Sequence, residues 1–246
     1  MSVKDKVVVI TGASSGIGEA TARQLAKDGA KLLLIARHEE VLKQIQSDFA
    51  DGQIMTAAVD VTDFDGLKDA IKQANDQFGR IDVLFNNAGI MPLSPLSAGK
   101  RDDWQRTVNV NIMGVLNGID AVLPYMHQQG SGHILATSST AGHKVFPTFA
   151  VYSGTKFAVR AIMDGLRQEE AANHIKSTVI TPGTVTTNLY KTIPGKEAQA
   201  AEASLHDNPN RSLRADDVAL QVVRAIDTPA NVSISEVNIR PIEQEA

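Results

Sequence analysis

The sequence contains no cysteine and has no excess of positive charge. Without cysteine the chain has no disulfides, thiolate nucleophiles or thiolate metal ligands, which suits a reducing compartment. The 24 Lys and Arg residues are outnumbered by 28 Asp and Glu residues, so no broad cationic field exists for nucleic acid or anionic lipid. The 6 histidines are scattered without metal-ligand spacing. We therefore expect no metal site, no nucleic-acid partner and no membrane partner.

Long apolar runs are also missing. No stretch reaches the length of a membrane-spanning helix, and residues 1–6 contain neither an apolar signal region nor a cleavage site. The sequence is therefore expected to belong to a cytoplasmic protein. Its 246 residues suffice for one large core, and no internal repeat divides them. We expect a single domain over residues 1–246.

The chain is organised around its first strand and the turn that follows. Residues 7–10, VVVI, form an apolar, β-branched run that is typical of a strand buried on both faces. Residues 11–18, TGASSGIG, then place three glycines where the strand becomes a helix. Glycine adds no Cβ, and a helix N-terminus carries partial positive charge, so such a turn suits an anion. The pattern predicts a phosphate cradle.

The spacing of this turn separates it from other phosphate-binding motifs. A P-loop has Lys-Ser or Lys-Thr after its last glycine, whereas here Ile17 follows Gly16. The pattern G-x-x-x-G-x-G resembles the first signature of the short-chain dehydrogenase/reductase family, whose members bind a nicotinamide dinucleotide on this turn. The alternative for the turn alone is a glycine-rich connection that binds nothing.

Apolar strand patterns alternate with helical patterns along the rest of the chain. Such alternation predicts a doubly wound, Rossmann-type α/β fold with a mainly parallel sheet of about seven strands, helices on both faces, and ligands at the carboxyl ends of the strands. The strands are expected at residues 7–10, 31–35, 54–59, 81–85, 133–139, 177–180 and 232–239, and the helices near 19–27, 41–49, 67–78, 101–127, 152–171 and 218–226.

Three further motifs extend the resemblance in the family's order. Residues 86–89, NNAG, follow a strand; Asn111 lies within a helical pattern; and Tyr152 precedes Lys156 by four residues, after a strand that ends in Ser139. Residues four apart share one face of a helix, so the phenol and the ammonium project to the same side. A Tyr-x-x-x-Lys pair alone proves little. The pair is significant because it follows the other motifs in the family's order, and the resemblance extends over residues 6–241.

The resemblance implies a catalytic set of Asn111, Ser139, Tyr152 and Lys156. Tyr152 is then the general acid and base, Ser139 holds the substrate oxygen, and Lys156 also holds the nicotinamide ribose. A tyrosine pKa near 10 must fall by about three units to act at neutral pH, and a unit charge about 4 Å away supplies a term of that size. Asn111 is expected to bend its helix and anchor a water. The alternative for Asn111 is a polar position on a half-exposed helix face.

The end of the second strand bears on cofactor choice. Ala36 stands where family members that use NAD carry an acid, and Arg37 comes next. A guanidinium can hold the 2′-phosphate of NADP, so NADP(H) is expected and NAD(H) is the alternative. Family members that use NADP often have a basic residue where this chain has Ser15. The alternative for Arg37 is a solvated charge at a helix start.

The same resemblance assigns the remaining cofactor contacts. Asp60 and Val61 are expected against the adenine, although Asp60 or Thr62 could instead cap a helix. The full expected set is Gly12, Ser14, Ser15, Gly16, Ile17, Gly18, Arg37, Asp60, Val61, Asn87, Ala88, Gly89, Tyr152, Lys156, Pro182, Gly183, Val185 and Thr187.

The expected function is NADP-dependent hydride transfer between an alcohol and a ketone or aldehyde. The alternative is a non-catalytic NADP(H)-sensing or scaffold protein of the same fold. Residues 188–214, which lack a clear strand pattern, are predicted to form a lid over a mainly apolar pocket. His143, Lys144 and Arg211 are candidate ligands for a substrate carboxylate. Family members often pair the helices over 101–127 and 152–171 between subunits, which predicts a homodimer or homotetramer.

Overall fold

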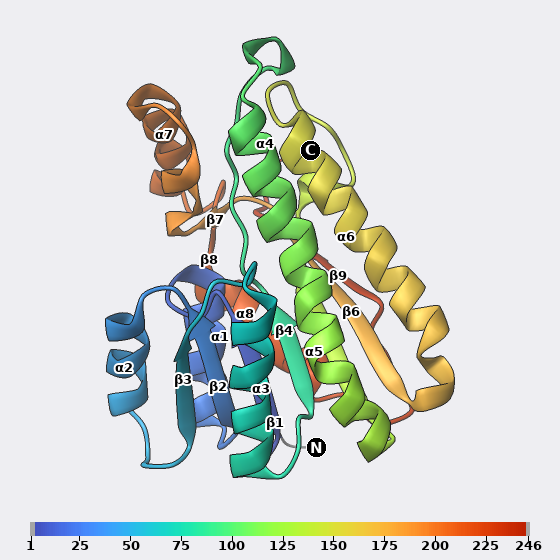
Figure 1. The fold of residues 1–246 in the computed structure, drawn as a ribbon. Helices are drawn as coiled ribbons and strands as arrows, with labels where there is room; N and C mark the ends of the chain where they lie inside the picture. The colour runs from blue at the N-terminus through green and yellow to red at the C-terminus, as the bar shows by residue number, and fades with distance from the viewer. Residues whose placement is uncertain (1–2, 245–246) are drawn as a thin grey trace.

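A computed structural model describes residues 3–244. Its centre is a seven-stranded, entirely parallel sheet with strand order β3-β2-β1-β4-β5-β6-β9, which confirms the predicted doubly wound fold (Figure 1). The strands are β1 Val7–Thr11, β2 Lys31–Ala36, β3 Ile54–Ala58, β4 Val83–Asn86, β5 Gly132–Thr137, β6 Ile175–Pro182 and β9 Glu236–Ile239. A separate parallel pair joins β7 Val185–Thr186 to β8 Leu213–Arg214.

Helices cover both faces of the large sheet (Figure 1). One face packs against α1 Gly16–Lys27, α2 Glu39–Ser47 and α8 Ala215–Ile226. The other face packs against α3 Phe64–Phe78, α5 Gly114–Gln129 and α6 Ala150–Glu169. Two further helices, α4 Arg101–Val108 and α7 Lys196–Ala203, lie above the sheet in Figure 1. None of the helices within residues 3–244 has both the length and the apolar character needed to cross a bilayer.

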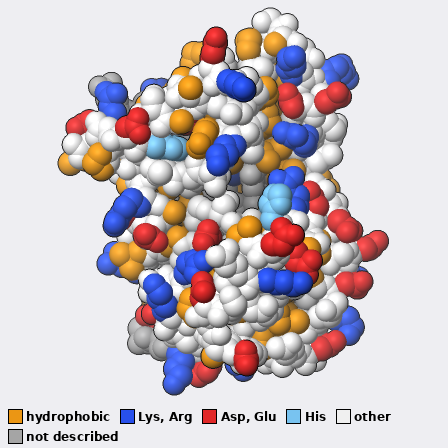
Figure 2. Space-filling model, turned by 90° about the vertical axis from the view of Figure 1, so that its left-hand side faces the viewer, with side chains coloured by type: hydrophobic (Ala, Val, Ile, Leu, Met, Phe, Trp, Pro, Cys, Tyr) orange, Lys and Arg blue, Asp and Glu red, His pale blue; other side chains and the backbone are white. Residues whose placement is uncertain are grey.

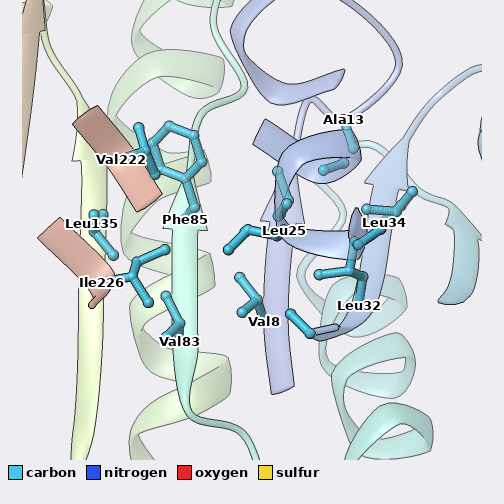
Figure 3. Packing of buried hydrophobic residues seen from close by; sticks show 14 of the residues in the cluster. Val8, Ala13, Leu25, Leu32, Leu34, Val83, Phe85, Leu135, Val222 and Ile226 are labelled. Atoms are coloured by element: carbon cyan, nitrogen blue, oxygen red, sulfur yellow. The ribbon is translucent and has the colours of Figure 1, made fainter. Parts of the chain in front are cut away.

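The buried first strand explains why its sequence is apolar without alternation. Val8 and Ile10 point into the core beneath α1 and α8, whereas Val7 and Val9 point into the opposite core. Figure 3 shows the first of these cores, in which Leu25 of α1 and Val222 of α8 pack over the sheet. The strand is therefore held on both sides, and the turn at its end has a fixed position.

The helix expected over residues 101–127 is interrupted in the structure. Its first part, α4, passes through one π-helical turn, Asn109–Met113, before α5 continues. The apolar stripe continues through the turn, which is why sequence periodicity predicted one helix. A π turn widens the backbone spiral by one residue, and such turns occur frequently at functional sites.

The last strand and the lid differ in detail from expectation. The strand predicted over 232–239 begins only at Glu236, because β6 offers it four paired positions, from Val179 opposite Glu236 to Pro182 opposite Ile239. The expected lid, 188–214, contains the short helix α7, and its last two residues form β8. Charged side chains of both signs are spread over the face that carries α2 and α7 (Figure 2).

Candidate active site

A cavity of about 1000 Å³ opens at the carboxyl ends of the parallel strands. Its wall includes nearly all of the expected cofactor residues; Gly18 is the exception. Of the expected catalytic residues, Ser139, Tyr152 and Lys156 line it and Asn111 does not. The sequence motifs, which are spread from Gly12 to Thr187, therefore meet at one end of the sheet.

The glycine turn has the backbone geometry that close approach to an anion requires. Gly12 and Gly16 have φ angles of +65° and +57°, in the left-handed region. A Cβ at Gly12 would lie 2.8 Å from the Cα of Ala88, and one at Gly16 would lie 2.9 Å from Cγ2 of Thr187. Because α1 begins at Gly16, its N-terminus faces the cavity. The turn thus fits the diphosphate of a dinucleotide.

Gly18 has a packing role in the same turn. A Cβ there would collide with the carbonyl of Gly12 and lie 2.6 Å from Nδ2 of Asn87. That Nδ2 donates to the carbonyl oxygens of Thr11 and Gly12, both at 3.3 Å. Gly18 therefore leaves room for the bonds that join the first turn to the NNAG segment.

The rim near the end of β2 carries two basic side chains. Arg37 lines the cavity and makes no hydrogen bond or ion pair within residues 3–244. His38 lies beside it and was not predicted from the sequence, since no motif marks that position. The side chain of Arg37 is therefore available to an anionic ligand.

Asp60 lines the cavity below this rim, and the capping alternative for Asp60 or Thr62 is wrong. The residue that caps α3 is Asp63, which accepts from the backbone N–H of Gly66 at 3.1 Å. Asp60 instead uses Oδ1 to accept from the backbone and hydroxyl of Thr62, at 2.9 and 2.7 Å. These two bonds to Thr62 hold the Asp60 side chain at the cavity wall.

The nicotinamide end of the expected cofactor set lies after β6. Pro182, Gly183, Val185 and Thr187 all line the cavity, and Thr187 accepts from the backbone N–H of Leu189 at 3.3 Å. The C-terminal segment reaches the same place, because Gln244 accepts from the N–H of Thr184 at 2.9 Å. Nothing in the sequence indicated that the C-terminal residues Glu243 and Gln244 line this cavity.

Ser139, Tyr152 and Lys156 come together where β5 and α6 meet the cavity. Ser139 follows β5, and its side chain is hydrogen-bonded to the phenol of Tyr152. Lys156 lies one turn along α6 from Tyr152, and its Nζ donates to the carbonyl oxygen of Thr137 at 2.8 Å. The same Nζ lies 5.7 Å from the centroid of the Tyr152 ring. The predicted pair therefore shares one face of the helix.

The pKa values of this pair correct one sequence prediction. Burial raises the pKa of Tyr152 to about 12, although the hydrogen bond from Ser139 opposes the rise. Burial also lowers the pKa of Lys156 to about 8. The structure does not show the expected lowering of the tyrosine pKa by Lys156, since loss of hydration outweighs the attraction between the charged forms. At neutral pH the phenol is protonated and suited to donate a proton.

Asn111 lies behind the cavity, within the π turn. Its side-chain amide accepts from the N–H of Ile90 and donates to the carbonyl of Ile90, both at 2.9 Å, and also donates to Oγ1 of Thr155 at 3.1 Å. A Cβ at Gly89 would lie 3.4 Å from Oδ1 of Asn111 and 3.6 Å from Nζ of Lys156. The alternative of a half-exposed polar position is wrong, because Asn111 is 1% exposed.

Next to Tyr152 the cavity is apolar and aromatic. Met91, Ala141 and Ile193 are buried there, with Phe146 and Phe149 partly buried against them. Of the candidate carboxylate ligands, Arg211 lines the cavity, whereas His143 and Lys144 do not. His143 bonds Glu236 at 2.6 Å, and Nζ of Lys144 lies 5.7 Å from the centroid of Phe146.

Comparison with known proteins supports the fold and the oxidoreductase class. A model of the short chain dehydrogenase family matches residues 6–198. An uncharacterised oxidoreductase of Staphylococcus saprophyticus is 49% identical over 245 residues, which is 99% of this chain and 98% of that protein.

Two solved structures resemble the chain along nearly its whole length. An alcohol dehydrogenase from the archaeon Thermococcus sibiricus, complexed with 5-hydroxy-NADP, has a TM-score of 0.87 and 29% identity and covers 99% of both chains. A serine dehydrogenase complexed with NADP+ has a TM-score of 0.91 and 27% identity, over 98% of this chain and 96% of that one. The chain therefore belongs to the short-chain dehydrogenase/reductase family and is an oxidoreductase of that family.

Proposed function

We propose that this protein interconverts an alcohol and a ketone or aldehyde, with NADP(H) as its cofactor. One observation carries the proposal: the side chains of Ser139, Tyr152 and Lys156 line the same cavity as the glycine turn. A proton donor and a dinucleotide cradle in one cavity are the two parts that carbonyl reduction needs.

In this proposal each side chain has one task. NADPH, when bound, supplies the hydride. The phenol of Tyr152, protonated at neutral pH because its pKa is about 12, gives its proton to the substrate oxygen. Ser139, whose one hydroxyl proton is directed at the phenol in the structure, turns that proton to the substrate oxygen when the substrate binds. Lys156 brings positive charge beneath the ring and holds the nicotinamide ribose. In the oxidising direction Tyr152 must first lose its proton, and positive charge nearby favours that loss.

The preference for NADP(H) is supported by the cavity rim. Arg37 is unpaired within the described residues, and its guanidinium suits a 2′-phosphate. Ala36 supplies no carboxylate that would repel the phosphate. Two structural neighbours were solved with NADP+ or a derivative of NADP.

The test of the proposal is the variant Tyr152→Phe, assayed with a panel of ketones and aldehydes. Hydride transfer should fall by about a thousandfold or more while the Kd of NADPH stays within about threefold, because only the proton donor is lost. An unchanged rate would refute the assignment of the proton donor.

A non-catalytic NADP(H)-sensing or scaffold protein is the competing function. It predicts that NADPH binds but that no carbonyl compound of a broad panel is reduced. The convergence of Ser139, Tyr152 and Lys156 on one apolar chamber favours the enzyme. Running the panel with NADPH and NADH in parallel separates the two functions and also measures the cofactor preference.

We also propose that the protein forms a homodimer or homotetramer through the helices predicted to pair. Apolar side chains on these helices are exposed: Val108, Met113, Leu116 and Phe157. Replacing Phe157 with Glu should shift the mass measured by light scattering toward the monomer. An unchanged mass would contradict pairing through this face. The expected cytoplasmic location stays a prediction.

A further inference from the structure

Glu202 is a charged side chain in the cavity for which the proposed reaction has no use. It lies in α7 of the lid, lines the cavity and is partly buried. It makes no hydrogen bond or ion pair with any residue from 3 to 244. Burial raises the pKa of its carboxyl group, because no partner compensates for the lost hydration. An unpaired carboxylate in a partly dry cavity gains stability when a cationic ligand binds beside it.

The negative charge of Glu202 also makes ionisation of the catalytic tyrosine less favourable. That charge is the smallest of the causes that act on the pKa of Tyr152, and it raises that pKa. An anion placed there disfavours the phenolate that alcohol oxidation requires. A cation held beside Glu202 would cancel this effect and would give the carboxylate its missing partner.

Aromatic rings line the same cavity as Glu202. Phe146 and Phe149 pack edge to face at 5.8 Å between centroids, and Phe149 packs in the same way on Tyr152 at 6.3 Å. Tyr190 lines the cavity on the lid side. The faces of aromatic rings attract cations, most strongly where water is excluded. Rings together with a carboxylate are the combination that binds an ammonium group.

Three basic side chains that line the same cavity, Lys191, Arg211 and His206, make contacts other than with Glu202. Nζ of Lys191 lies 6.0 Å from the centroid of Tyr190, and Arg211 pairs with Glu243 at 3.6 Å. His206 packs edge to face on Tyr190 at 5.5 Å, and burial lowers its pKa, so it is a poor source of charge. Glu202 therefore remains open to a ligand.

We propose that the substrate carries a compact cationic ammonium group, which binds between Glu202 and the aromatic rings while its carbonyl or hydroxyl group faces Tyr152. This substrate class rests on the proposed alcohol and carbonyl chemistry, and it makes Glu202 a specificity-determining residue. The reaction itself is unchanged: hydride and proton still add to the carbonyl carbon and oxygen.

The test uses two substrates that differ in charge and hardly in shape. Trimethylammonioacetaldehyde and 3,3-dimethylbutanal differ only in a quaternary nitrogen replacing a quaternary carbon. The wild-type protein with NADPH should favour the cationic aldehyde in kcat/KM, and Glu202→Gln should reduce that preference by about tenfold or more. Glu197→Gln, which removes the same charge from an exposed position of α7 outside the cavity, should leave the preference unchanged.

A binding experiment makes the outcome independent of turnover. Titration calorimetry of choline against the protein with NADPH, which cannot oxidise an alcohol, should give tighter binding than 3,3-dimethylbutan-1-ol. Glu202→Gln should weaken choline binding about tenfold, and Glu197→Gln should not.

The outcomes separate the substrate class from the proposed function. If the neutral aldehyde is reduced and Glu202→Gln leaves the charge preference unchanged, the ammonium site is wrong and the carbonyl chemistry stands. If neither aldehyde is reduced but choline binding depends on Glu202, the ammonium site stands and the carbonyl chemistry fails for this class. Choline binding that is absent, or equal in Glu202→Gln, overturns the ammonium site.

Discussion

Nζ of Lys156 lies 5.7 Å from the centroid of the Tyr152 ring, while its hydrogen bond goes to the carbonyl oxygen of Thr137. The two side chains share a helix face and a dry environment. Burial raises the pKa of Tyr152 and lowers that of Lys156, so it favours the neutral form of each. Tyr152 has a pKa of about 12 and Lys156 one of about 8. Near neutral pH the tyrosine keeps its proton, and the charge of the lysine is the property that changes first as pH rises.

Carbonyl reduction should therefore slow above about pH 8. Below that pH Lys156 is cationic and stabilises the negative charge that develops as Tyr152 gives up its proton. Above it, the lysine is neutral and that stabilisation is lost. The measurement is kcat/KM for reduction between pH 6 and 10, where wild type should decline toward the low rate of Lys156→Met. If kcat/KM of Lys156→Met declines at the same pH as that of the wild type, the decline arises from another group.

The catalytic pair could be predicted from the sequence, but its electrostatics could not. Spacing of four residues is a local property of a helix, so the shared face of Tyr152 and Lys156 follows from the sequence alone. Their pKa values depend on burial, to which residues far away in the chain contribute, such as Met91 beside Tyr152. The charge of the lysine can be counted from the sequence, but the water that both groups lose on folding cannot.

In the rest of the site, too, local features could be predicted from the sequence and features that depend on tertiary packing could not. The glycine turn could be predicted because Gly12 and Gly16 act through backbone conformation beside a buried strand. Glu202 could not, since a glutamate in an alanine-rich helix is typical of a solvated surface, and only the placement of α7 against the cavity gives it meaning. His38 was missed for a similar reason, because no motif marks its position at the rim.

Arg37→Ala should weaken NADPH binding more than NADH binding. Loss of a charged hydrogen bond to a phosphate costs about 1.5–3 kcal/mol, which is about 10- to 100-fold in Kd. The Kd of NADH, which lacks the 2′-phosphate, should stay within about twofold. Fluorescence titration of both cofactors measures this. As control, Lys43→Ala removes a cation of α2 that pairs with Glu39 at 2.6 Å and lies outside the cavity, so it should leave both constants unchanged. Equal losses for both cofactors would exclude a phosphate contact.

Asn111→Leu should destabilise the protein by about 2–6 kcal/mol. The change leaves the N–H and the carbonyl of Ile90 buried without partners, and each unsatisfied group costs about 1–3 kcal/mol. Urea unfolding measures the loss. Asn117→Leu in α5 is the matched control, because Asn117 donates one bond, to the carbonyl of Val61 at 2.8 Å, and should cost about 1 kcal/mol. Equal losses in the two variants would show that the pair of hydrogen bonds between Asn111 and the backbone of Ile90 does not add to stability beyond a single bond.

His133 should make the protein sensitive to mild acid. It is 3% exposed on β5, its Nε2 lies 2.8 Å from Oγ1 of Thr178, and burial lowers its pKa to about 3. Between pH 6.5 and 3 the unfolded chain binds a proton here that the folded chain excludes, so stability rises with pH across this window and falls on acidification. The expected loss from this group between neutral pH and pH 5 is about 2 kcal/mol.

The variant His133→Asn should remove that part of the acid sensitivity. Its free energy of unfolding in urea, measured at pH 7.5, 6 and 5, should fall by about 2 kcal/mol less than that of the wild type. His174→Asn is the matched control, because His174 is exposed and its φ of 58° lies in the left-handed region that asparagine tolerates. This control should keep the wild-type slope. If His133→Asn also keeps it, the folded protein accepts a proton at His133 without penalty, and the acid sensitivity must arise from other groups.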